Sequence, residues 1–161
     1  MDRDDFAGRV KAMEDRLYRV ACGQLTDHSD REDAVQEAIF KAWRGRSRLR
    51  NGAYFETWLI RILINECRNI QRARKRMVPA GDLPEQEQDL LLPERERELR
   101  EAIRTMDEKL RRPVVLYYIA GYDTKEIAQI LRLPHGTVCG RLKRAREVLK
   151  GYLAQGEQKE R

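Results

Sequence analysis

Residues 121–146 decide the fold of this chain, and they read GYDTKEIAQILRLPHGTVCGRLKRAR. Asp123 and Glu126 stand three residues apart, which is the spacing of a capping box with Asp in place of the usual Ser or Thr, and this predicts the start of a helix. The helix should end just before Pro134, because a residue that precedes proline avoids helical backbone. Pro134 can then take the first position of a second helix, where its missing N–H is not needed. The stretch therefore predicts two short helices joined by a tight turn.

The second of these helices has one apolar face and one polar face. Val138 and Leu142 should face inward, and the small Ala128 fits where the two helices cross. The opposite face carries Thr137, Cys139, Gly140, Lys143 and Arg144. Such a face can enter the major groove of DNA, while cations beside it (Arg141, Arg146 and Lys150) can reach phosphates. The pattern predicts a DNA-binding helix-turn-helix, and the alternative is a basic helical hairpin with a solvated charged face.

Composition sets the limits for the whole chain. Of its 161 residues 37% are charged and 7% aromatic, which favours helices and allows two modest cores. The formal net charge of +6 suggests an anionic partner, but charge alone does not choose between nucleic acid, a membrane surface and an acidic protein. Cys22, Cys67 and Cys139 are far apart, so we expect no disulfide framework, no metal site and no cofactor. Without a signal peptide or a long apolar run, we expect a cytoplasmic protein with no membrane insertion.

The organisation along the chain predicts an all-α protein of two small helical domains joined by a flexible linker. Helices are expected over 6–25, 31–43 and 55–76 and, in the second domain, over 107–120, where Pro113 would be tolerated only near the first turn. The predicted units are a first domain over 1–77, an acidic linker over 78–93, a helix-turn-helix domain over 94–154 and a polar tail over 155–161.

Residues 121–128, 133–138 and 141–146 closely resemble the C-terminal domain of bacterial RNA polymerase sigma factors of the sigma-70 family, extracytoplasmic-function (ECF) subfamily. Two upstream stretches extend the resemblance. Residues 30–43 (DREDAVQEAIFKAW) look like the polymerase-binding helix of that family. Residues 55–62 (FETWLIRI), with Asn65, look like its segment for minus-ten recognition and strand opening. The match covers nearly the whole chain, and the order of the motifs agrees with the family.

The resemblance implies a role for three groups of residues. Core polymerase would bind Asp33, Gln36, Glu37 and Phe40. The minus-ten element would bind Trp58, Arg61, Asn65, Arg68 and Arg72, with Asn65 placed to capture a flipped base. The minus-thirty-five element would bind Thr137, Cys139, Gly140, Arg141, Lys143, Arg144 and Arg146. Cys139 and Gly140 depart from the basic or polar residue and the Ser that the family usually has there.

The function that the resemblance implies is non-enzymatic. The protein would bind core RNA polymerase, recognise minus-ten and minus-thirty-five elements of promoter DNA and assist melting, and an anti-sigma factor would regulate it. A stand-alone helix-turn-helix regulator remains an alternative that needs no polymerase-binding helix. The third possible function is that of a small helical nuclease. The sequence disfavours it because no carboxylate cluster lies beside the basic segments.

Overall fold

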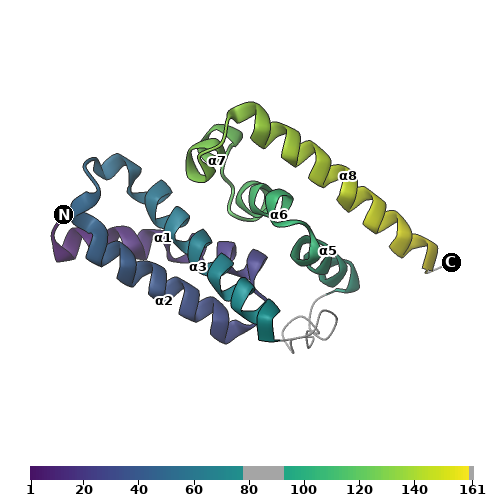
Figure 1. Ribbon diagram of the computed structural model, residues 1–161, viewed down its shortest axis with the longest axis horizontal. Helices are drawn as coiled ribbons and strands as arrows, with labels where there is room; N and C mark the ends of the chain where they lie inside the picture. Colours follow the sequence, from purple (N-terminus) through teal and green to yellow (C-terminus); the bar gives the residue numbers. More distant parts are fainter. Residues whose placement is uncertain (78–92, 160–161) are drawn as a thin grey trace.

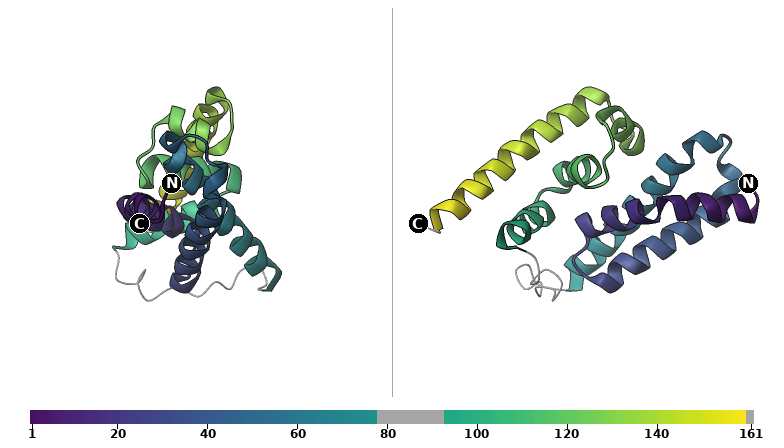
Figure 2. Two further views of the ribbon diagram at one scale, coloured as in Figure 1. Left: turned by 90° about the vertical axis from the view of Figure 1, so that its left-hand side faces the viewer. Right: turned by 180° about the vertical axis from the view of Figure 1, so that it is seen from behind.

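The computed structural model describes residues 1–77 and 93–159, and all regular elements within them are helices or helical turns (Figure 1). This confirms the all-α prediction. The predicted acidic linker lies outside the described residues except for Pro93. Figure 2 shows the same two groups of helices from the side and from behind.

The first group contains α1 (Arg3–Gln24), α2 (His28–Gly45) and α3 (Phe55–Met77), and two short 3-10 turns, η1 (Arg46–Arg48) and η2 (Gly52–Tyr54), connect α2 with α3. Side-chain caps fix where helices begin: Asp2 accepts a hydrogen bond from the Asp5 backbone N–H at 2.9 Å, and Asp27 accepts one from that of Asp30 at 3.1 Å. The apolar sides of the three helices face one another. Their fully buried side chains are those of Leu17, Val20, Ala21, Ala34, Ala38, Ala42, Leu59, Ile60, Leu63 and Cys67.

The second group contains α5 (Glu94–Thr105), α6 (Glu108–Val114), η3 (Val115–Ile119), α7 (Thr124–Leu131) and α8 (His135–Lys159). The prediction for 107–120 was wrong in one respect: Pro113 lies near the end of α6, not in its first turn. Proline has no N–H to continue the helical hydrogen bonding, and two residues after it the helix widens into the π-helical turn η3. The helix α8 continues to Lys159, so part of the segment predicted as a polar tail is helical.

The helix α7 begins where the sequence predicts, but its end is set by a different feature. The capping box at Asp123 and Glu126 is present in both directions, with hydrogen bonds of 2.8 Å each. The helix α7 ends because Arg132 adopts left-handed backbone with φ of 54°, a conformation uncommon for residues other than glycine. Pro134 precedes the first residue of α8, and its carbonyl accepts hydrogen bonds from the backbone of Thr137 and Val138.

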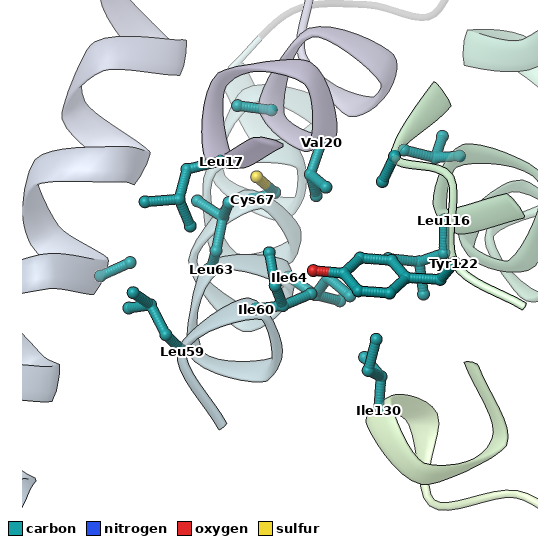
Figure 3. Close-up of a cluster of buried hydrophobic side chains, with 14 of the residues drawn as sticks. Leu17, Val20, Leu59, Ile60, Leu63, Ile64, Cys67, Leu116, Tyr122 and Ile130 are labelled. Atoms are coloured by element: carbon teal, nitrogen blue, oxygen red, sulfur yellow. The ribbon is translucent and has the colours of Figure 1, made fainter. Parts of the chain in front are cut away.

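The two helical groups share one connected hydrophobic core instead of forming two separate ones. Figure 3 shows Ile60 and Ile64 of α3 facing Leu116, Tyr122 and Ile130 of the second group. All five side chains are buried. The helix α1 also packs closely on η3, because a Cβ added at Gly23 would lie 2.8 Å from both methyl groups of Val115. The described structure is therefore a closed arrangement, in which the second group packs on α1 and α3.

Candidate polymerase-binding and DNA-binding surfaces

One face of α2 brings together the four residues that were predicted to bind polymerase. Asp33, Gln36 and Glu37 are exposed, and Phe40 is 53% exposed with the Arg44 guanidinium 5.6 Å from its ring centroid. The core packing of α2 uses other positions: Ala34, Val35, Ala38 and Ala42. Packing within the described residues therefore leaves the aromatic ring of Phe40 open to contact by a partner.

The side of this face next to α3 is acidic. A hollow between the two helices is lined by Asp30, Asp33, Gln36, Glu37, Phe40, Glu66 and Ile70. Lys41 pairs with Glu66 and lies 3.9 Å from Glu37, and the hydrogen bond to Glu66 raises the pKa of Lys41. Arg74 binds Asp30 with two hydrogen bonds of 2.8 and 2.9 Å. Asp33 makes no such pair among the described residues, so this face presents negative charge to a partner.

The predicted minus-ten residues follow one side of α3, but the structure separates them into two sets. Asn65 and Arg72 are exposed, while Trp58 is half-buried with its ring 6.1 Å from that of Phe55. Arg61 and Arg68 instead contact the second group of helices. Only part of the predicted minus-ten surface is thus open in this arrangement.

Arg61 binds the C-terminal end of α7. Its Nε donates to the carbonyl oxygen of Ile130 at 2.9 Å, and its Nη2 donates to that of Gln129 at 2.7 Å. The last carbonyls of a helix lack partners within the helix and carry partial negative charge, so a guanidinium stabilises them. Burial and the neighbouring Arg132 lower the pKa of Arg61. Arg68 makes a weaker contact, with its Nε 3.5 Å from Glu108.

A second polar contact between the groups was not predicted from the sequence. Glu56 on α3 accepts a hydrogen bond from the Tyr122 hydroxyl at 3.0 Å and another from Arg16 of α1. The Arg16 guanidinium also lies over the Tyr122 ring, 4.8 Å from its centroid. Burial raises the pKa of Tyr122 far above its usual range. No local pattern could indicate this contact, because its residues are far apart in the sequence.

The loop between α2 and α3 is held to α1. Arg9 donates a 2.8 Å hydrogen bond to the carbonyl oxygen of Gly52, and Asn51 caps the turn η2 through the backbone N–H of Ala53 at 3.0 Å. Tyr54 is 55% exposed beside them. The loop thus has a fixed base and an exposed aromatic side chain.

The predicted minus-thirty-five residues occupy the N-terminal half of α8. Val138 and Leu142 are buried, as the helix-turn-helix pattern predicts, and Ala145 is buried as well. The exposed residues are Gly140, Lys143, Arg144 and Arg146, and the half-buried ones are Thr137, Cys139 and Arg141. A Cβ at Gly140 would meet nothing within 4 Å, so tertiary packing does not require glycine there.

His135 joins the two helices of the motif. Its Nε2 lies 2.7 Å from the Thr124 hydroxyl and 3.6 Å from the Cys139 sulfur. Thr124 is the first residue of α7, and His135 is the first of α8. This contact therefore fixes one helix start against the other.

Across 1–77 and 93–159, no helix is long and apolar enough to cross a membrane. In the same ranges, no group of three or more His, Cys, Asp or Glu side chains is arranged to hold a metal ion.

Comparison with known proteins identifies the family. Residues 9–77 match Sigma-70 region 2, and residues 96–149 match Sigma-70, region 4. An ECF RNA polymerase sigma-E factor of Haemophilus influenzae is 30% identical over 158 residues, covering 86% of this chain and 84% of that protein. The RNA polymerase sigma-H factor of Pseudomonas aeruginosa is 32% identical over 140 residues, covering 76% and 72%.

Solved structures agree with these sequence matches. The sigma factor RpoE of Bartonella quintana, solved in complex with the anti-sigma factor NepR, has a TM-score of 0.75 at 25% identity, covering 93% of this chain and 97% of that one. CnrH, solved with the cytosolic domain of CnrY, shares the fold with a TM-score of 0.78 at 24% identity, covering 96% and 90%. The chain therefore belongs to the sigma-70 family and is an ECF sigma factor, which directs RNA polymerase to promoters.

Proposed function

We propose that the three surfaces divide the work of initiation among them. The exposed face of α2, with Asp33, Gln36, Glu37 and Phe40, binds core polymerase. The residues Trp58, Arg61, Asn65, Arg68 and Arg72 of α3 contact the minus-ten element. The N-terminal half of α8 contacts the minus-thirty-five element through Thr137, Cys139, Gly140, Arg141, Lys143, Arg144 and Arg146. The observation that carries this division is the exposed aromatic and acidic face of α2 within the segment that matches region 2.

The units predicted from the sequence fit this division. Residues 1–77 act as the polymerase-binding and minus-ten domain, and 94–154 act as the minus-thirty-five domain. The protein itself performs no covalent chemistry, because opening of the promoter draws on contacts with extruded bases and on polymerase. It acts in the cytoplasm, where its polymerase and its promoters are.

An anti-sigma protein is the proposed regulator. The support is that two structural neighbours, RpoE of Bartonella quintana and CnrH, were solved with NepR and with the cytosolic domain of CnrY. The exposed Phe40 and the acids beside it form a surface that such a protein could cover in competition with polymerase.

Run-off transcription with core polymerase, this protein and a promoter library tests the proposal. We expect initiation at a defined subset of promoters only when both proteins are present. Absence of specific initiation together with absence of core binding would contradict it. Turnover of DNA by the pure protein would contradict the non-enzymatic role.

The recognition helix gives a prediction of its own. Arg144 is exposed on α8, and its replacement by Ala should reduce minus-thirty-five selectivity by about 1–3 kcal/mol, which is the value of a bidentate contact with a base. Competition binding across single-base variants of the promoter measures this loss of selectivity. Lys150→Ala is the control, since loss of a phosphate contact should weaken all sequences equally. An unchanged sequence preference in Arg144→Ala would show that Arg144 reads no base.

A further inference from the structure

The turn of the helix-turn-helix contains a residue type that its backbone disfavours. In the part of the chain that the structure describes, Arg132 is the one residue other than glycine with positive φ, at φ of 54° and ψ of 48°. In this left-handed conformation the Cβ atom lies too close to the following carbonyl oxygen, and glycine avoids that cost. Glycine would therefore end α7 at a lower cost, so the arginine points to a use of its side chain.

The fold itself makes little use of the Arg132 side chain. This side chain is exposed, and within residues 1–77 and 93–159 it makes no hydrogen bond or ion pair. The carbonyl oxygens of Gln129 and Ile130, which a cation at this end of α7 could bind, accept hydrogen bonds from Arg61 instead. Burial and the charge of Arg132 lower the pKa of Arg61. Within the described residues, the charge of Arg132 is therefore opposed by a like charge and has no acidic partner.

The position of Arg132 next to α8 indicates what its side chain binds. Arg132 lies between α7 and α8, three residues before His135, which is the first residue of α8. When the second helix of such a motif lies in the major groove, the first helix crosses the sugar–phosphate backbone. An exposed residue in the turn between them then lies at the edge of the groove. A guanidinium at that edge can bind a phosphate with two parallel hydrogen bonds.

We infer that Arg132 binds a backbone phosphate at the edge of the minus-thirty-five element and thereby orients α8 in the major groove. This inference rests on the proposed minus-thirty-five role of α8. It adds a contact from the turn to the contacts proposed for the helix. It assigns no reading of bases to Arg132, since a phosphate contact fixes register but carries no sequence information. Arginine in place of glycine then lowers the stability of the free protein and raises its affinity for DNA.

Three substitutions separate the charge of Arg132 from its backbone. Arg132→Gly removes both the charge and the left-handed cost, Arg132→Ala removes the charge alone, and Arg132→Lys keeps both. Urea unfolding of the free full-length chain measures the effect of the backbone. We expect a higher urea midpoint for Arg132→Gly than for wild type and the other two variants, because only glycine adopts this backbone without strain.

Promoter binding by the holoenzyme measures the effect of the charge. Each variant is combined with core polymerase, and fluorescence anisotropy follows a labelled promoter duplex that wild-type protein selects in run-off transcription. Arg132→Gly and Arg132→Ala should both bind about tenfold more weakly, as expected for the loss of a hydrogen bond to a charged group. Their slope of log K against log salt should be shallower by about 0.9, the value for one phosphate. Arg132→Lys should keep the wild-type slope.

Two comparisons show whether the contact is local and independent of base sequence. Arg19→Ala is the matched control, because it removes the same charge from an exposed position on α1, and it should keep the wild-type affinity and salt slope. Arg132→Ala should weaken binding to all single-base variants of the minus-thirty-five element by the same factor, as expected for a phosphate contact.

Four results would overturn the inference. A wild-type salt slope in Arg132→Ala would mean that this side chain binds no phosphate. A loss of binding in Arg132→Gly that Arg132→Ala does not share would belong to the backbone. A lower urea midpoint for Arg132→Gly than for wild type would show that the arginine serves the fold. An equal loss of slope in Arg19→Ala would make the effect one of net charge. Failure of the proposed function would differ, since wild-type holoenzyme would then bind the duplex regardless of its minus-thirty-five sequence.

Discussion

Replacement of Asp33, Gln36 and Glu37 together by Ala is expected to lower the affinity for core polymerase by at least about 30-fold, because truncation of even one hot-spot residue costs ~2 kcal/mol or more. All three side chains point away from the packed side of α2. Their loss should leave the core of the protein intact. Co-purification with core polymerase, followed by a titration, measures the effect.

A control triple variant has the same change in charge. Asp4 and Asp15 on α1 and Gln129 on α7 are exposed, and their side chains belong to none of the three proposed binding surfaces. Their replacement by Ala should leave core binding within about twofold of wild type, as expected for surface changes of up to ~0.5 kcal/mol. Equal losses in both triples would place the polymerase contact elsewhere.

Ile127→Ala should reduce the free energy of unfolding by about 2–5 kcal/mol, because the side chain is fully buried where α7 packs in the helix-turn-helix and its removal leaves a cavity. Binding to minus-thirty-five DNA should weaken as the position of α8 is lost. Urea unfolding measures the first effect, and binding to a duplex that carries the minus-thirty-five element measures the second.

Val148→Ala serves as the control for this change. Val148 lies on α8 with 46% of its surface exposed, so its truncation should change stability by no more than about 0.5 kcal/mol. Similar destabilisation by both substitutions would mean that Ile127 does not occupy the core of the motif.

Local patterns predicted the helix-turn-helix well. The capping box at Asp123 and the inward positions of Val138 and Leu142 follow from spacing alone, and the structure confirms both. The stripe of α2 likewise separates its buried alanines from the exposed residues that resemble a polymerase-binding face. Such features depend on residues within one or two turns, so they are visible in the sequence.

The parts that the sequence did not predict depend on contacts over long distances or on unusual backbone. Nothing in the sequence indicates that Arg61 contacts α7. Only the closed arrangement brings its guanidinium to two carbonyl oxygens of that helix. Arg132 in left-handed backbone is not indicated by its residue type, because glycine is the usual choice. The π turn after Pro113 replaces regular helix that the apolar period alone predicts.

The hydrogen bond between His135 and Thr124 has a consequence for the energetics of promoter docking. Together with the Asp123 capping box and the backbone of Arg132, it fixes the start of α8 relative to α7 before DNA arrives. Ordering of groups on binding reduces affinity, and preorganisation removes that entropic loss. Gly140 gives the proposed recognition face no side chain and adds backbone freedom. The rigid turn offsets that freedom, so fewer base contacts can still give a defined docking orientation.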